Sequence, residues 1–165
     1  MAKTDNITQD RLKQLLNYNP ETGIFTWIVK KQGTRSNKIA GTKRDDGRIA
    51  INIDGILYLA HRLAWLYMHG EIPKEIDHIN MDPSDNRIIN LRAATHMQNN
   101  YNKEKQKNNS SGYKGVAWHK GSGKWQAYIN IDGKRVALGL FICPELAHLA
   151  YSEYATKYHK EFARV

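Results

Sequence analysis

The order of hydrophobic and polar positions predicts short helices and strands in the first seventy residues. Leucines at helical spacing follow Thr8, which fits an N-cap. The Asp54-Gly55 pair between two β-branched runs is the strongest hairpin signal of this half, and Gly70 is a fitting helix stop. In chain order, we expect a helix at 8–17, a strand at 23–29, a hairpin at 48–53 and 56–59, and a helix at 60–69.

The central part of the chain predicts a small hairpin followed by a helix. Its elements are a strand at 76–79, a loop of turn formers at 81–86, a brief return at 88–89 and a helix from about 93 to about 105. Thr95 is expected inside this helix. Residues 105–111 are polar and contain no core residues, so they are predicted to be a linker.

The last third predicts three strands and one helix. Asp132-Gly133 is a second hairpin signal, and Pro144 suits the first turn of a helix. The strands are expected at 113–120, 124–131 and 134–140, and the helix from 144 to about 158. The predicted apolar face of this helix is formed by Leu146, Leu149, Ala150 and Tyr154. Three strands with one helix form about the smallest sheet unit that is stable alone.

Together these elements predict the α+β class. The first domain is expected at residues 1–107, the linker at 108–111, and the second domain at 112–165. A hydrophobic share of 41% is sufficient for packed cores. Neither a membrane span nor a secretory signal is expected, and the single Cys143 excludes an internal disulfide. A cytoplasmic protein without a membrane partner is therefore expected.

The net charge of +9 is unevenly distributed. Residues 1–75 carry 12 Lys and Arg against 8 Asp and Glu, and residues 112–165 carry 8 against 4. The centre, residues 76–111, is nearly neutral, with 5 against 4. Basic flanks suit the binding of phosphates, while a neutral centre leaves a carboxylate available for a metal ion.

Three residue types in the centre point to phosphodiester hydrolysis. Asp77 and Asn99 offer a carboxylate and an amide oxygen, hard donors that suit one Mg²⁺ or Mn²⁺ ion. His78 is the natural general base, because imidazole is half neutral near physiological pH. Adjacent residues on a regular strand point to opposite faces, so Asp77 and His78 must sit where the strand curls into the loop. The side chain of Asn90 is expected to tie the ends of that loop and orient His78.

These residues, with Asn86-Arg87 and Asn90-Leu91-Arg92 between them, resemble an HNH endonuclease of the phage and intron-encoded homing type. The resemblance implies a ββα-metal core at about 75–105, with Asp77 and Asn99 as metal ligands and His78 activating water. Asn90 would brace the loop. His96 and Asn100 are rival ligands on the same predicted helix. Arg62 is a candidate phosphate contact or a structural ion-pair partner.

The C-terminal unit has a separate resemblance. Ser111–Val116, Gly123–Ala127, Leu138–Phe141 and Glu145–Tyr151 are similar to the plant ethylene-response-factor type of DNA-binding domain. The resemblance implies a three-stranded sheet that enters the major groove, with a helix packed behind it. The residues expected on its DNA-contacting solvent face are Lys114, Trp118, Lys120, Lys124, Trp125 and Arg135. A second DNA-contacting surface is expected around the first sheet, at Lys30, Lys31, Arg35, Lys38, Lys43, Arg44 and Arg48.

The sequence therefore predicts a metal-dependent DNA endonuclease with site preference. Its expected partner is double-stranded DNA, its cofactor one divalent ion (Mg²⁺ or Mn²⁺) with no small-molecule cofactor, and its state a monomer. Phage or mobile-element origin would place it in the bacterial host cytoplasm. The alternative is a DNA-binding regulator with a silent nuclease centre. An RNA-directed protein ranks lower, since no aromatic ribonucleoprotein signature is visible.

Overall fold

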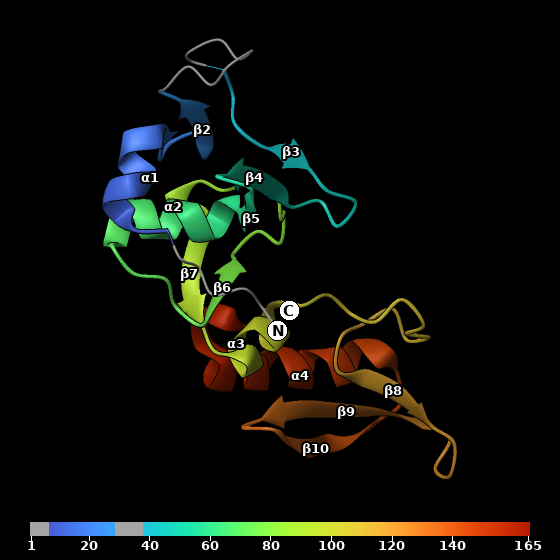
Figure 1. Cartoon of the computed structure of the whole chain (residues 1–165). Coiled ribbons are helices and arrows are strands. Elements are labelled where there is room, and N and C mark those ends of the chain that lie inside the picture. The colour runs from blue at the N-terminus through green and yellow to red at the C-terminus, as the bar shows by residue number, and fades with distance from the viewer. Residues whose placement is uncertain (1–6, 29–37) are drawn as a thin grey trace. The chain divides into compact units, whose positions relative to one another are not determined.

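The computed structural model describes residues 7–28 and 38–165, which divide into two compact units (Figure 1). Unit 1 ends at Ala94, and unit 2 spans Thr95–Val165. The predicted DNA contacts Lys30, Lys31 and Arg35 lie outside the described residues. The chain divides before the predicted linker at 108–111, so helix α3 (His96–Asn102) belongs to unit 2. The domain limits proposed from the sequence stay a prediction.

Unit 1 begins with helix α1 (Gln9–Leu15), whose first turn is capped by the Thr8 hydroxyl. Strands β1 (Leu16–Asn19) and β2 (Ile24–Trp27) follow as an antiparallel pair. Leu12 of the helix and Leu16, the first residue of β1, are both fully buried in the core of this unit. The helix predicted at 8–17 is present but ends at Leu15, because Leu16 and Asn17 pair with β2 in a strand that was not predicted. The strand predicted at 23–29 is present at Ile24–Trp27.

A three-stranded sheet with the order β3-β4-β5 forms the middle of unit 1. It contains β3 (Thr42–Lys43), β4 (Ile49–Ile53) and β5 (Ile56–Leu59). Asp54 and Gly55 both have positive φ, at 50° and 82°, as the predicted Asp-Gly hairpin turn requires. Helix α2 (Ala60–His69) follows at once and ends at Gly70, whose φ is 81°.

Unit 1 ends in a hairpin of β6 (Glu75–His78) and β7 (Leu91–Ala94), joined by a loop and the single 3₁₀ turn η1 (Ile88–Asn90). The helix predicted from about 93 is therefore wrong at its start. Ala93 and Ala94 pair with β6, and Thr95 caps helix α3 (His96–Asn102) rather than lying inside it. Cross-strand pairing outweighs the helix propensity of the two alanines here.

Unit 2 contains α3 and a three-stranded antiparallel sheet with the order β10-β9-β8. The strands are β8 (Val116–His119), β9 (Lys124–Ile131) and β10 (Lys134–Phe141). Helix α4 (Pro144–His159) packs on this sheet, and the short 3₁₀ turn η2 (Lys160–Phe162) follows it. The predicted α+β class and the predicted three-stranded sheet with one helix are confirmed. No helix of the described segments is long and apolar enough to cross a membrane.

The buried face of α4 differs from the predicted one. Leu146, Leu149 and Tyr154 are 46%, 57% and 40% exposed, so their prediction as the packing face is wrong. The sheet instead contacts the face that carries Ala147, Tyr151, Ala155 and His159. Small alanines let the helix approach the sheet closely, and the Tyr151 ring lies directly over Gly115, where a Cβ would meet it at 2.1 Å.

Candidate nuclease site

The carboxylate of Asp77 lies at the end of β6, opposite Arg92 of β7. Arg92 binds the same carboxylate oxygen through two nitrogens, at 2.8 Å from Nε and 2.7 Å from the terminal nitrogen. Asp77 is 4% exposed, so this is a well-shielded ion pair. The register of the hairpin, which sequence reasoning did not use, is what brings Arg92 to the predicted metal ligand.

The ring of His78 lies edge-on to the ring of His61, with the centroids 5.0 Å apart. His61 comes from α2, and both rings are buried. Burial lowers the pKa of His78 below its usual range and lowers the pKa of His61 to about 3. Both imidazoles are therefore neutral at physiological pH, and a neutral imidazole is the form that accepts a proton.

Basic residues of the first sheet lie close to the two histidines. The charge of Arg48 adds to the lowering of the pKa of both rings, after burial. Arg48 and Arg44 flank Asp46, at 3.2 and 3.6 Å, and Lys43 acts on Asp82 in the loop after β6. This part of the predicted DNA-contacting surface therefore adjoins the predicted base.

The side chain of Asn90 crosses the loop between β6 and β7. Its amide oxygen accepts the Asn80 N–H at 3.0 Å, and its amide nitrogen donates to the Asn80 side-chain oxygen and to the Asp85 carbonyl, both at 2.9 Å. Backbone bonding adds to this, since the N–H of Ile79 donates to the Asn90 carbonyl. These bonds hold the segment that follows His78 in one conformation.

The same loop is also supported from the first hairpin, a feature that the sequence analysis missed. The Tyr18 hydroxyl donates to the Asn86 carbonyl at 2.7 Å. Gly23 has a φ of 71°, and a Cβ there would meet the backbone of Asn86 and Arg87 at 2.5 Å. The sequence predicts a turn at 19–23 from residues such as Gly23. It does not show that this glycine lies against Asn86 and Arg87, more than sixty positions further along the chain.

We expect Asn90→Ala to lower both stability and cleavage. The exchange removes three hydrogen bonds and leaves the Asn80 and Asp85 groups without this partner, which costs about 1–3 kcal/mol of unfolding free energy. Thermal unfolding and plasmid cleavage measure the two effects. Asn17→Ala, at an exposed position of β1, is the control and should change neither. Wild-type cleavage by Asn90→Ala would remove the bracing role.

The buried histidines predict that unit 1 loses stability in acid. The pKa of His61 is 6.5 in an unfolded chain and about 3 when folded, so only the unfolded state takes up a proton as the pH falls below 6.5. The loss from His61 alone should be about 1 kcal/mol by pH 5.5 and should grow further towards pH 3. Denaturant titrations at pH 7.5, 6.5 and 5.5 measure it. A His61→Phe protein should show a smaller acid loss, and an equal loss would contradict the assignment to His61.

Helix α3 carries the predicted second metal ligand and its two rivals. Thr95 and Gln98 form a capping box at its N-terminus, which sets the helical register of His96, Asn99 and Asn100. The side-chain oxygen of Asn100 accepts a hydrogen bond from Lys103 Nζ at 2.6 Å. Asn99 stays the predicted second ligand, with His96 and Asn100 as its rivals.

The donor groups present suit a hard divalent ion. Asp77 supplies a carboxylate, and Asn99 an amide oxygen, on segments that the sequence analysis assigned to one ion. Within the described ranges, no group of three or more His, Cys, Asp or Glu side chains forms a metal cluster. The proposed ligand set contains one carboxylate and one amide, so it leaves most of the coordination sphere to water and substrate.

The predicted DNA contacts of unit 2 lie on different sides of its sheet. Trp125 packs with Ala127 against the core beside α4, and Trp118 pairs with Trp125 across the strands, with ring centroids 5.0 Å apart. The expectation that Trp125 lies on the solvent face is therefore wrong, because strand alternation turns it towards the helix. Trp118 is 47% exposed at the rim of the same side. Lys124 and Gln126 occupy the opposite face, and Gln126 was missed.

The remaining predicted contacts have varied surroundings. Lys120 is exposed in the turn between β8 and β9. The Arg135 guanidinium stacks over the Tyr128 ring at 3.9 Å. Lys114 donates to the backbone carbonyls of Tyr101 and Lys103, so it closes the end of α3 rather than projecting freely. In unit 1, Arg62 donates to the Pro73 carbonyl at 3.4 Å.

Comparison with known proteins identifies a phage relative of this chain. A relative, Protein 3.8 of Escherichia phage T7, is 36% identical over 77 residues, which make up 46% of this chain and 64% of that protein. The chain thus matches less than two thirds of that relative's length. No solved structure matches. The resemblance of residues 112–165 to the plant ethylene-response-factor type is not supported by these comparisons.

The family comparison matches the segment that contains the candidate site. Residues 58–101 match the family model described as HNH endonuclease. Asp77, His78, Asn90 and Asn99 all lie inside this match. His61, which the geometry adds to them, lies inside it as well. The centre of this chain, residues 58–101, thus matches the HNH endonuclease family.

Proposed function

We propose that this protein is a metal-dependent endonuclease that cuts double-stranded DNA with site preference. The observation that carries the proposal is the neutral, buried His78 beside Asp77, at the mouth of a loop braced by Asn90, within the HNH match. The phage relative supports a phage origin and action in the host cytoplasm. Action as a monomer is part of the proposal.

In the proposed hydrolysis of the phosphodiester bond, His78 acts as the general base. His78 takes a proton from a water molecule, the water oxygen bonds to phosphorus, and the bond from phosphorus to the 3′-oxygen breaks. The products are a 5′-phosphate and a 3′-hydroxyl. Arg48, whose charge reaches His78, suits a phosphate oxygen of the bound strand. A divalent ion held by Asp77 and Asn99 would offset the negative charge that develops on the phosphate and the departing oxygen.

In this proposal, unit 2 binds the DNA and sets the site preference. Its candidate contacts are Lys120, Lys124, Gln126 and Arg135, together with the exposed rim residue Trp118. In unit 1, Lys43, Arg44 and Arg48 would contact phosphates near the cut. These two DNA-binding roles, in unit 2 and in unit 1, correspond to the two basic flanks of the sequence.

The test of the proposed function is cleavage of supercoiled plasmid with Mg²⁺ or Mn²⁺, compared with the same reaction in EDTA. Nicked or linear product that requires the ion, with 5′-phosphate ends, supports the proposal. Selection of cleaved sites from a random duplex library then measures the site preference. Absence of cleavage under either ion, at protein concentrations that bind the DNA, contradicts it.

One observation favours the alternative of a DNA-binding regulator with a silent nuclease centre. The Arg92 guanidinium already neutralises the Asp77 carboxylate, so a metal ion has to compete with it. Tight, salt-sensitive binding of duplex DNA without cleavage would support this alternative. Competition between RNA and duplex DNA separates both from an RNA-directed protein.

A further inference from the structure

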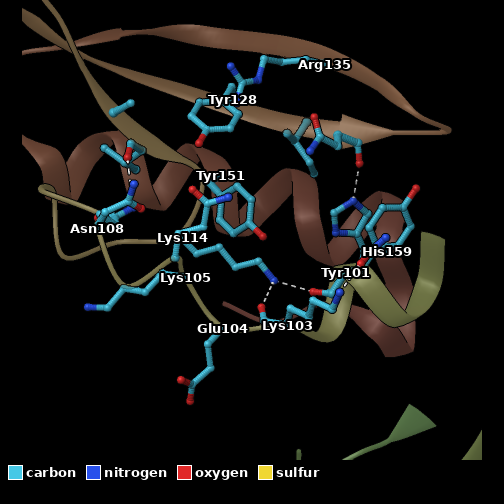
Figure 2. Close-up of a pocket in the computed structure, with 18 of the residues that line it drawn as sticks. Tyr101, Lys103, Glu104, Lys105, Asn108, Lys114, Tyr128, Arg135, Tyr151 and His159 are labelled. Atoms are coloured by element: carbon cyan, nitrogen blue, oxygen red, sulfur yellow. Dashed lines mark hydrogen bonds between the residues drawn. The ribbon is translucent and has the colours of Figure 1, made fainter. Parts of the chain in front are cut away.

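A cavity of about 700 Å³ lies within unit 2. It is bounded by α3 and the segment after it, by the edge of the sheet at β8 and β9, and by Tyr151 and His159 of α4 (Figure 2). This volume falls in the range of small-ligand sites, about 300–1,000 Å³. The side chains that line the cavity therefore indicate which kind of ligand it could bind.

The walls carry an excess of positive charge. Lys103, Lys105, Lys114 and Arg135 line the cavity, against one acidic residue, Glu104. Glu104 already pairs with Arg164 at 3.3 Å. None of the four cations has a carboxylate partner among the residues that the structure describes. The cavity therefore offers uncompensated cations to a negatively charged ligand.

Lys114 is the most constrained of these cations. Its ammonium group donates to the carbonyls of Tyr101 and, at 2.6 Å, of Lys103, as the dashed lines in Figure 2 show. An ammonium group has three N–H donors, so one remains for a ligand. Burial, and after it the nearby positive charge of Arg164, lowers the pKa of Lys114 to about 8. A bound anion would stabilise the charged form of the buried Lys114 ammonium.

Aromatic rings also line the cavity. The rings of Tyr101 and His159 stack 3.7 Å apart, at an angle of 7°. His159 Nε2 lies 2.8 Å from the Asn130 carbonyl, so in the neutral ring this nitrogen carries the hydrogen and Nδ1 is an acceptor. Nδ1 is buried and has no hydrogen-bond partner. Across the cavity, the Arg135 guanidinium lies over the Tyr128 ring.

We propose that this cavity binds a nucleoside monophosphate, with the phosphate at Lys114 and the base across the cavity, beside Tyr128 and Arg135. A cation without a carboxylate partner selects the phosphate, while the Tyr128 ring and the Arg135 guanidinium offer flat faces on which a base can stack. The nucleotide is either free or the terminal nucleotide of a DNA strand. The proposal does not depend on the nuclease centre, so a His78→Ala protein should bind equally well.

The experiment measures binding of dAMP, deoxyadenosine, inorganic phosphate and a 5′-phosphorylated single-stranded oligonucleotide to the full chain, by calorimetry in EDTA. We expect dAMP to bind at least about ten times more tightly than deoxyadenosine or phosphate, because both halves of the ligand contribute. Weak binding of dAMP, with tighter binding of this oligonucleotide than of the same oligonucleotide without its 5′-phosphate, identifies the strand end as the source. Equal binding of dAMP and phosphate would reduce the site to a charge effect and overturn the proposal, as would no binding of any probe.

Matched variants locate the binding. Lys114→Met should weaken the binding of dAMP, or of the oligonucleotide if that is the ligand, by about tenfold or more. Lys157→Met removes the same charge from the exposed side of α4 and should change it less than about twofold. Since Lys114 also closes α3, Arg135→Gln is a second test that leaves those hydrogen bonds intact. Unchanged affinity in Arg135→Gln and in a folded Lys114→Met protein would overturn the proposal.

Discussion

Plasmid cleavage is expected to fall by about 10²–10⁴-fold when His78 is replaced by alanine, because the reaction then loses its general base. Binding of duplex DNA should stay within about twofold of the wild type, since His78 is buried against His61 and is not a surface cation. Initial rates of nicking under Mg²⁺, with binding measured in parallel in EDTA, test both statements.

His69→Ala is the matched control for this experiment. His69 lies in the last turn of the same helix that carries His61, is exposed, and stacks on Trp65 rather than on His78. Its replacement should leave the cleavage rate unchanged. A His78→Ala protein that is folded and cuts at the wild-type rate would remove His78 from the mechanism, and with it the proposed proton transfer.

The second large effect is expected at Asp77. In Asp77→Ala the Arg92 guanidinium loses its shielded partner, which costs about 3–5 kcal/mol of unfolding free energy. Cleavage should be lost as well, because the carboxylate proposed to bind the ion is gone. Thermal unfolding and plasmid cleavage would both record large losses, but a loss of folding alone could account for them.

A double exchange separates the two causes. Asp77→Ala with Arg92→Leu removes both charges, so it should recover most of the lost stability. It should not recover cleavage, and Mn²⁺ binding followed by electron paramagnetic resonance should stay weaker than in the wild type. Arg92→Leu alone should keep or tighten Mn²⁺ binding, since it frees the Asp77 oxygen. Wild-type cleavage by the double variant would show that Asp77 serves only the fold.

Local structure was largely predictable where one residue type decides it. The Asp54-Gly55 and Asp132-Gly133 pairs both form hairpin turns with positive φ, because these residues tolerate that region at low cost. Pro144 begins α4, as its missing N–H and fixed φ favour. The helix after β7 was placed too early because local propensity carries no information about the strand partner of Ala93 and Ala94.

The buried face of α4 shows where pattern alone was misleading. Large apolar residues usually mark the packing face, yet Leu146 and Leu149 are exposed and Ala147 and Ala155 are buried. The sheet approaches closely at Gly115, and only small side chains fit there besides the one Tyr151 ring. The face of α4 that packs on the sheet is decided by the shape of the sheet surface opposite it. The sequence of the helix contains no information about that shape.

For the candidate site, the sequence by itself determined the chemistry on offer: a carboxylate at Asp77, an imidazole at His78 and an amide at Asn90, adjacent to or near one turn-rich loop. The tertiary structure alone decided what surrounds them, namely His61 from α2 against His78 and Arg92 on Asp77. Residue type is a local property, whereas burial and partner are set by strand register and helix packing between distant segments. Those surroundings make the imidazole neutral and hold the carboxylate paired.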